Sequence, residues 1–392
     1  MKNYSVSIFI LLFGQVCFGQ EHFTVAWSGN GLDQMNIQVV TANIGGVQLD
    51  AHDEIAVFDG AICCGKVVLT QSVDFSNAST YATIVASRQD GAEPNGYTIG
   101  HPIIFKFWDS GAGVEYDEIA AEYYDTGSTL LPPQPYAIDG SVIVKVGAPA
   151  VFKTQINVFL EGPYNESSGT MNASLNLPLS QPFLGSPWNY SGTETVATIP
   201  SGVVDWALIE LRQATSPTVA TSATTFATRA AFLKSTGEIV EMDGSSLPDF
   251  GEHILADGNN LYLVVRHRNH LAVMSSIGAN LSNGVFLYDF TSGIGQVYGS
   301  GAGFKEIASG VFGMVSGDAD NDGTVSVLDF SLWATDFGQT NSYIPADFDL
   351  DREISVLDFT HWAINFGVDN ISQLKRAKMN QEKGKFITQV PK

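Results

Sequence analysis

The chain has 392 residues, and its 41 Asp and Glu against 19 Lys and Arg give a formal net charge of −22 at pH 7. This shortage of basic residues argues against a nucleic-acid-binding surface and against a polybasic contact with a membrane. Hydrophobic residues make up 44% of the chain, enough for the cores of about two or three domains. The 39 Gly, the 15 Pro and the 11% aromatic residues favour short strands and turns over long helices.

The first twenty residues have the pattern of an export signal. Lys2 precedes an apolar run over residues 6–13, and small residues stand near Gly19, where a signal peptidase would cut. We therefore expect residues 1–20 to be removed and the protein to be secreted or held at the cell surface. After the signal, no stretch approaches the roughly eighteen apolar residues that a transmembrane helix needs. Cys63 and Cys64 then remain as an adjacent pair, and a strained vicinal disulfide is not expected.

Two segments of the chain show the pattern of antiparallel sheets. We expect residues 54–58, with Ile55 and Val57 on one face, to form a half-buried strand within a segment that spans residues 21–148. Strand-like runs such as residues 261–265, separated by Gly and Asp turns, recur over residues 151–312. We therefore predict a mainly β protein with two consecutive β-sandwich-like modules.

The composition changes after these modules. Residues 313–370 contain 11 acidic residues and one basic residue, Arg352. Within them, residues 318–338 and 347–367 agree at 12 of 21 positions. The last segment, residues 371–392, has six Lys or Arg against one Glu and too little apolar area to fold alone, so we expect it to be disordered.

Each copy of the repeat begins with the pattern of a Ca²⁺-binding loop. Oxygen-bearing side chains stand at loop positions 1, 3, 5, 9 and 12, with a backbone carbonyl at position 7. Four carboxylates in one loop repel one another unless a cation offsets their charge. We therefore expect two Ca²⁺ ions. The expected ligands are Asp318, Asp320, Asp322, Thr324, Ser326 and Asp329 in the first loop, and Asp347, Asp349, Asp351, Glu353, Ser355 and Asp358 in the second.

The doubled loop resembles a type I dockerin, because Asp stands at position 12 and one helix-like segment follows each copy, over residues 330–337 and 359–366. The resemblance covers about 55 residues. It implies a small α-helical, EF-hand-type module that binds a cohesin-like module or another cell-envelope protein. Trp333 and Trp362 lie one turn into the two segments and are expected to pack in its core.

Two features depart from the dockerin pattern. Arg352 replaces the glycine of loop position 6, where a positive φ is usual, so the second site is expected to bind Ca²⁺ more weakly. Positions 10 and 11, often hydroxylated in dockerins, are Val-Leu in both copies, at residues 327–328 and 356–357. These pairs form either an apolar face for a partner or the module's own core.

The two β modules resemble pieces of secreted multidomain proteins of the Bacteroidetes type. The second is similar to a non-catalytic β module through residues 160–164, 187–190 and 265–274. The first is similar to β-sandwich modules of the same proteins through residues 53–60 and 95–100. Neither resemblance implies a reaction.

Other polar clusters have both a functional and an ordinary interpretation. His267 and His270 invite a metal site, but on a strand they would point to opposite faces, so structural hydrogen bonding is favoured. A further cation site is weighed against ordinary turn roles for Asp53, Glu54, Asp59 and Asp90.

The sequence contains no Gly-x-Ser-x-Gly elbow and no His-Glu-x-x-His zinc helix, which favours a non-catalytic protein without excluding an enzyme. Our leading hypothesis is an exported modular protein that docks through its C-terminal Ca²⁺-binding repeat. The alternative is an accessory or catalytic component of extracellular polysaccharide degradation. Stacking on a glycan would use Trp108, Trp188 and Tyr190, and a polysaccharide-acting hydrolase would use two of Glu161, Asp205, Glu210 and Asp243.

Overall fold

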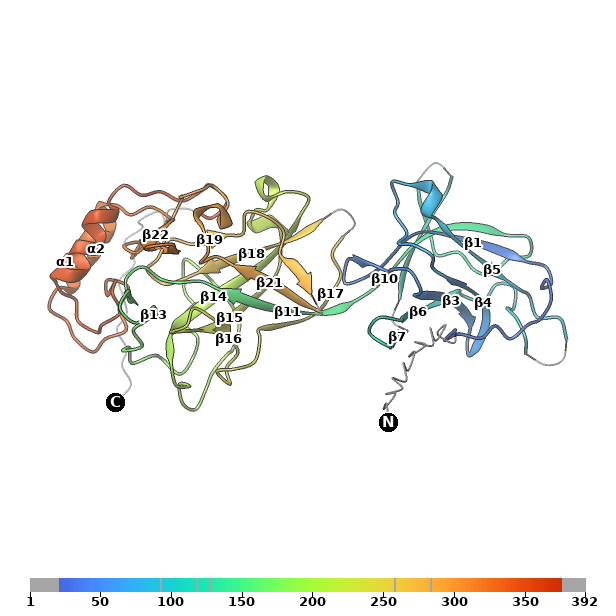
Figure 1. Ribbon diagram of the computed structural model, residues 1–392, viewed down its shortest axis with the longest axis horizontal. Helices are drawn as coiled ribbons and strands as arrows, with labels where there is room; N and C mark the ends of the chain where they lie inside the picture. The colour runs from blue at the N-terminus through green and yellow to red at the C-terminus, as the bar shows by residue number, and fades with distance from the viewer. Residues whose placement is uncertain are drawn as a thin grey trace, which may run out of the picture. The chain divides into compact units, whose positions relative to one another are not determined.

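The computed structural model describes residues 21–91, 94–117, 119–126, 129–256, 259–282 and 284–375. The signal-peptide prediction and most of the basic tail lie outside these ranges. The chain divides into two compact units, Met1–Pro149 and Ala150–Lys392. The predicted mainly β fold class is confirmed (Figure 1). Two α-helices lie near the C-terminal end of the described residues, and no helix there has both the length and the apolar character needed to cross a membrane.

The first unit consists of two sheets that share one apolar core. Ile37 and Val39 of one sheet and Ile55 and Phe107 of the other belong to the same buried cluster, as alternation along half-buried strands requires. Cys63 and Cys64 are both free and buried. One sheet has the order β2-β1-β10-β8-β9 with β5 beside β1, formed by β1 (Met35–Ile44), β2 (Val47–Gln48), β5 (Ala82–Ala86), β8 (Ala120–Tyr124), β9 (Leu130–Leu131) and β10 (Ser141–Ala148). The other has the order β4-β3-β6-β7, formed by β3 (Glu54–Asp59), β4 (Ile62–Val68), β6 (Ile104–Asp109) and β7 (Val114–Tyr116).

The second unit is built around β14 (Val203–Ala214), which is buried at nearly every position. Ile209 and Leu211 point into the main apolar cluster, while Trp206 and Leu208 belong to a second cluster on the opposite face. The central sheet has the order β16-β15-β14-β18-β19, with β15 (Thr225–Lys234), β16 (Ile239–Val240), β18 (Asn260–Arg266) and β19 (Val273–Met274). The second sheet has the order β17-β11-β21-β20, with β11 (Ala150–Asn157), β17 (Asp249–His253), β20 (Asn280–Ser282) and β21 (Val285–Asp289).

Short elements complete both units. Two small hairpins belong to the second unit, β12 (Tyr164–Asn165) with β13 (Thr170–Met171), and β22 (Phe304–Ala308) with β23 (Val311–Met314). The described 3-10 helices are Ala78–Thr80, Pro217–Val219, Ser222–Thr224 and Ile294–Gln296.

The two α-helices, α1 (Val327–Asp336) and α2 (Val356–Asn365), lie side by side in the second unit (Figure 1). Both begin three residues earlier than the sequence pattern suggested, because Ser326 and Ser355 act as N-caps in capping boxes closed by an Asp three residues later. Trp333 and Trp362 link the two copies of the repeat by hydrogen bonds. Trp333 donates its ring N–H to the Ser355 carbonyl at 2.9 Å, and Trp362 donates to the Ser326 carbonyl at 2.7 Å.

The chain after α2 returns to the β module. Leu374 is only 2% exposed and packs in a cluster with residues of β14 and β18. Two buried arginines hold the segment, since Arg212 donates to the Gln373 carbonyl at 3.2 Å and Arg266 to the Leu374 carbonyl at 3.1 Å. For residues 371–375 the expected disorder is therefore wrong: guanidinium groups that the sequence does not place near them bind the carbonyls of Gln373 and Leu374.

Candidate metal centre

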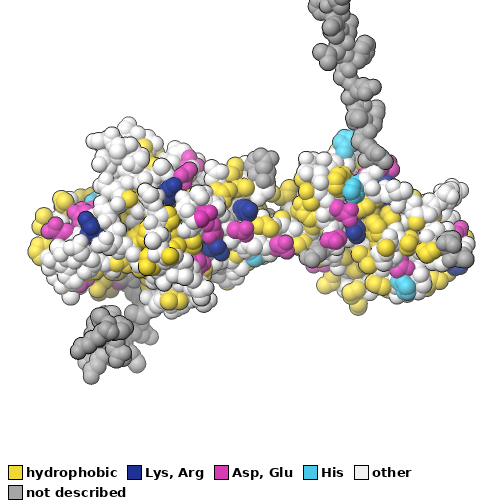
Figure 2. Space-filling view, turned by 90° about the horizontal axis from the view of Figure 1, so that it is seen from below, with side chains coloured by type: hydrophobic (Ala, Val, Ile, Leu, Met, Phe, Trp, Pro, Cys, Tyr) yellow, Lys and Arg dark blue, Asp and Glu magenta, His cyan; other side chains and the backbone are white. Residues whose placement is uncertain are grey.

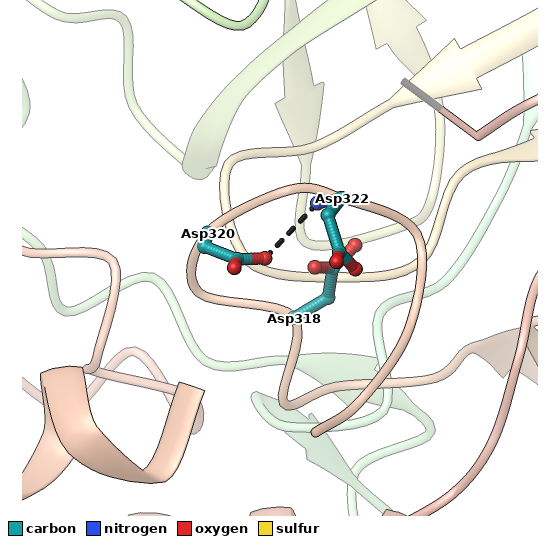
Figure 3. Close-up of side chains that lie close together, drawn as sticks. All are labelled: Asp318, Asp320 and Asp322. Atoms are coloured by element: carbon teal, nitrogen blue, oxygen red, sulfur yellow. Dashed lines mark hydrogen bonds between the residues drawn. The ribbon is translucent and has the colours of Figure 1, made fainter. Parts of the chain in front are cut away.

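The first loop, residues 318–329, brings three carboxylates together. Oxygens of Asp318, Asp320 and Asp322 all lie within 4.8 Å of one another, and Figure 3 shows the three side chains converging inside the curve of the backbone. Two backbone N–H groups hold them, because Asp322 donates to Asp320 Oδ1 at 3.1 Å and Gly323 donates to Asp318 Oδ2 at 3.2 Å. The other oxygen of Asp318, Oδ1, is buried without a hydrogen-bond donor.

The electrostatics of this loop favour a bound cation. Asp318 is only 3% exposed, and its burial, together with the nearby Asp329, Asp320 and Asp322, raises its pKa well above the ordinary value. A buried carboxylate oxygen with no donor is costly unless a cation takes the donor's place. The donor set is entirely oxygen, the type that hard cations such as Ca²⁺ prefer. The residues of the first loop therefore fit a bound metal ion.

The second loop, residues 347–358, also brings three carboxylates together, from positions 1, 3 and 12. Oxygens of Asp347, Asp349 and Asp358 lie within 4.8 Å of one another. Burial, and then the neighbouring carboxylates of Asp358, Asp351 and Asp347, raise the pKa of Asp349 to about 8. Burial likewise raises the pKa of Asp347 to about 6, although Arg268 opposes the shift. The two loops thus share the same chemistry.

The other predicted ligands have additional roles in the loops. Asp329 and Asp358, at position 12, accept hydrogen bonds from the N–H groups of the helix N-caps, at 2.7 and 2.8 Å. The Ser326 and Ser355 hydroxyls accept from backbone N–H groups two residues later, as N-caps do. Thr324 and Glu353, at position 7, form backbone bridges to Asp369 and Thr340. Asp351 accepts from the Glu353 N–H at 2.8 Å.

The backbone of the two loops is the same at the position of the sequence departure. Gly323 has a φ of +90° and Arg352 a φ of +81°. The positive φ expected at position 6 is therefore present in both copies, although only one has glycine there. Arg352 holds a left-handed conformation that its Cβ disfavours.

The Val-Leu pairs of both helices lie at the surface. Val327 is 60% exposed and Val356 63%, while Leu328 and Leu357 are 42% and 56% exposed. Phe337 and Phe366, at the ends of the helices, are also exposed. The pairs are thus not part of the module's own core, and hydrophobic side chains are visible at the helical end of the second unit in Figure 2.

His267 and His270 meet in space, contrary to the expectation that they point apart. The strand β18 ends at Arg266, so both histidines belong to a loop, and their Nδ1 atoms share a hydrogen bond of 3.2 Å. His267 Nε2 pairs with Asp205 at 3.1 Å, and His270 Nε2 accepts from the Gly162 N–H at 3.3 Å. Because the ring nitrogens contact protein groups, these histidines act in structural hydrogen bonding.

The remaining candidate carboxylates each have their own partners. In the first unit, Asp53 accepts from the Asp50 and Ser110 N–H groups, Glu54 pairs with Lys66, Asp59 pairs with His101, and Asp90 is bonded to Asn95. In the second, Glu161 pairs with Lys305, Asp205 with Arg268, Glu210 with Arg212 and Arg266, and Asp243 accepts from Ser245 and Ser246. These contacts are those of turns and ion pairs.

The aromatic candidates pack against the protein. Trp108 stacks on His22 with ring centroids 3.8 Å apart, Trp188 lies edge-on to Phe183, and the Tyr190 hydroxyl donates to Glu194 at 2.5 Å.

A partial match to a phosphate loop, Gly60 to Lys66, falls in the β3–β4 hairpin and has Val67 where that motif has Ser or Thr.

Comparison with known proteins gives no relative. No family model matches the chain, and no curated protein matches it. Among solved structures, a shaft pilin of Lactobacillus rhamnosus GG aligns over 65% of this chain and 98% of its own, with 9% identity and a TM-score of 0.15. A protein of Bacteroides ovatus described as a cell adhesion protein aligns over 64% of this chain and 90% of its own, with 12% identity and a TM-score of 0.14.

Proposed function

We propose that this is an exported, non-catalytic modular protein whose C-terminal repeat binds two Ca²⁺ ions and docks it to a partner at or outside the cell surface. The observation that carries the proposal is the Oδ1 atom of Asp318, which is buried within a group of three carboxylates and has no hydrogen-bond donor. A second group of three carboxylates lies in the second loop at Asp347, Asp349 and Asp358, which hold positions 1, 3 and 12, whereas the first group holds positions 1, 3 and 5.

Ca²⁺ would be held by carboxylate, hydroxyl and carbonyl oxygens of each loop. It takes about six to eight such ligands and tolerates irregular geometry, whereas Mg²⁺ demands a near-ideal octahedron. The ligands would come from positions 1, 3, 5, 7, 9 and 12, with position 7 contributing its backbone carbonyl. When bound, the ion supplies positive charge that offsets the repulsion among the carboxylates.

Docking would use the exposed faces of α1 and α2. The two helices present the same Val-Leu pair at the same position of each copy, and all four side chains are more than 40% exposed. Paired apolar residues at the surface of a folded module are typical of contact sites for another protein. The dockerin-like spacing of the loops suggests a cohesin-type module as the partner.

Calorimetric titration of the full chain with Ca²⁺ tests the metal sites. We expect binding of two ions and, at free Ca²⁺ about 100 times the dissociation constant, stabilisation by about 2.7 kcal/mol for each site. Asp320→Asn should remove one site, while Asp117→Asn, at an exposed position of the first unit, should change nothing. Absence of heat in the unaltered protein would refute calcium binding.

Docking is tested separately with a panel of immobilised type I cohesin modules. We expect capture in Ca²⁺ and release by a chelator. The double variant Leu328→Asp and Leu357→Asp should bind two Ca²⁺ ions yet lose capture, because it places charges on the exposed apolar pairs. Capture that survives this variant, or the failure of every module to bind in Ca²⁺, would count against docking through this face.

A further inference from the structure

One residue of the β module contacts the start of both loops. Asn269 is completely buried, and its backbone carbonyl accepts from the N–H groups of Gly317 and Asp318 at 3.1 and 3.2 Å. Its side-chain amide donates to the carbonyls of Pro345 and Asp347 at 2.9 and 2.5 Å. Asp318 and Asp347 hold position 1 of the first and second loop, so Asn269 fixes the backbone at the first ligand of each.

The preceding residue, Arg268, anchors the segment before the second loop. Its guanidinium donates to Asp205 Oδ2 at 2.8 Å and to the Ile344 carbonyl, and it lies 4.4 Å from the centre of the Tyr343 ring. The Tyr343 hydroxyl completes the group by donating to Asp205 Oδ1 at 2.6 Å. The backbone carbonyl of Arg268 accepts from the Asn321 amide of the first loop at 2.5 Å. Both loops are therefore held by hydrogen bonds to two consecutive residues of one turn.

The second loop also contributes to the core of the β module. Phe348 and Leu350 are completely buried, and Leu350 belongs to the main apolar cluster together with Ile209 of β14. The backbone there is in close contact, because a Cβ added to Gly162 would lie 1.8 Å from the Phe348 carbonyl oxygen. Removing a buried leucine side chain from such a core destabilises the fold, because the surrounding atoms fill the cavity only in part. The core of the β module is thus complete only while the second loop is folded.

We infer that residues 268–270 couple the two loops to each other and to the β core, so that Ca²⁺ stabilises the whole second unit and not the C-terminal repeat alone. This inference rests on the proposed function, since it takes the loops to bind Ca²⁺. Without the ion, repulsion among the carboxylates opens the second loop. Phe348 and Leu350 then leave the core, and the loss is transmitted to β14 and β18.

Hydrogen exchange measured by mass spectrometry on the full chain tests the coupling without any mutation. At free Ca²⁺ about 100 times the dissociation constant, we expect exchange of the β14 and β18 amides to slow by about 100-fold for each bound ion relative to the protein in chelator. The strands β1 and β10 of the first unit serve as the internal control and should not respond.

The possible outcomes separate the two proposals. Slower exchange confined to residues 318–369 would leave calcium binding intact and overturn the coupling. No response anywhere would refute calcium binding and the coupling with it. Slower exchange across β14, β18 and both loops supports the inference.

Variants test the role of the segment itself. Asn269→Ala should reduce the Ca²⁺-induced protection of β14 and β18 at least about tenfold, and a variant that keeps full protection would overturn the role of this residue. If Asn269→Ala does not fold, Asn321→Ala, at a half-buried position, should show a smaller reduction. Gly162→Ala should also weaken the coupling, whereas Gly185→Ala, whose added Cβ meets no atom within 4 Å, is its matched control.

Discussion

Position 6 of the second loop holds a side chain in a conformation that suits glycine. Arg352 has a φ of +81° and is exposed, so its Cβ strains the backbone while its side chain gains little burial. A non-glycine residue in the left-handed region costs on the order of 1 kcal/mol. Gly323 meets the same requirement in the first loop without that strain. The two sites should therefore differ in Ca²⁺ affinity although their carboxylates are alike.

Arg352→Gly is expected to raise the Ca²⁺ affinity of the second loop about fivefold, which corresponds to about 1 kcal/mol. Titration calorimetry on the full chain measures the change. Arg352→Ala is the control that separates the causes, because it removes the charge and keeps the Cβ. If Arg352→Ala tightens binding as much as Arg352→Gly, the effect comes from charge and the backbone argument fails.

The residues that could be predicted from the sequence are those whose partners are close along the chain. Asp318, Asp320 and Asp322 lie in one short loop, so their spacing alone indicates that their oxygens converge. Asn269 could not be assigned, because its contact with Asp347 joins residues 78 positions apart. The sequence pattern draws attention to the neighbouring histidines and gives no sign that the asparagine between them contacts both loops, one through its side-chain amide and the other through its backbone carbonyl.

At the scale of elements, the turn after β18 is a buried polar segment between two apolar strands. Burial lowers the pKa of His267 even though Asp205 opposes the shift. Burial lowers the pKa of His270 well below its ordinary value, and the charges of His267, His361, Arg268 and Lys305 act in the same direction. Burial also lowers the pKa of His361 on α2. The turn is therefore folded with neutral imidazoles.

The stability of the second unit should fall as the pH falls through about 6.5 toward 5. These histidines take up protons near pH 6.5 when unfolded, but their folded pKa values are lower, so acid favours the unfolded state. Burial alone would raise the pKa of Asp205, but Arg268, His267 and Tyr343 lower it to about 2, so its contribution is lost only below about pH 4.

Thermal or denaturant unfolding in saturating Ca²⁺ measures this pH dependence. Each histidine that stays neutral contributes a slope of up to about 1.4 kcal/mol per pH unit. His270→Gln should flatten the slope by up to one such contribution. If the second unit becomes more stable as the pH falls from 7 to 5, the assignment of neutral buried histidines is contradicted. An unchanged slope of stability against pH in the variant would contradict it as well.

The presence of an element could be predicted from the sequence where the residue pattern is local. The residues at which elements begin or end could not. The strand expected in residues 54–58 corresponds to β3, although its first four positions are all buried. Both helices are present but begin three residues before the expected start, at Val327 and Val356, because Ser326 and Ser355 cap them. His267 and His270 do not point to opposite faces as expected, because β18 ends at Arg266 and both histidines belong to the turn that follows it. A strand end is set by the contacts of the next segment, and those are not local.

On the scale of the whole molecule, the chain is two units with separate apolar cores. The first core draws only on residues of the first unit, and the main core of the second includes Leu350 from the calcium-loop repeat. The mainly β class follows from composition and alternation. The integration of the repeat into the second core does not, because it depends on packing between segments more than 100 residues apart, which places Leu350 in one cluster with Ile209.

The two cores should respond differently to Ca²⁺, and Cys63 and Cys64 provide a probe for the first. Burial raises the pKa of Cys63 to about 11 and that of Cys64 to about 12, so both thiols should be unreactive until the first unit opens. In the chain from residue 21, thiol labelling at increasing denaturant should follow the unfolding of the first unit with the same midpoint in Ca²⁺ and in chelator. Calorimetry on the same samples should show a second transition that moves to lower temperature in chelator. The described residues of the first unit include neither of the two acidic groups that could hold the ion. A thiol-labelling midpoint that shifts with Ca²⁺ would therefore mean that the first unit is also coupled to the loops.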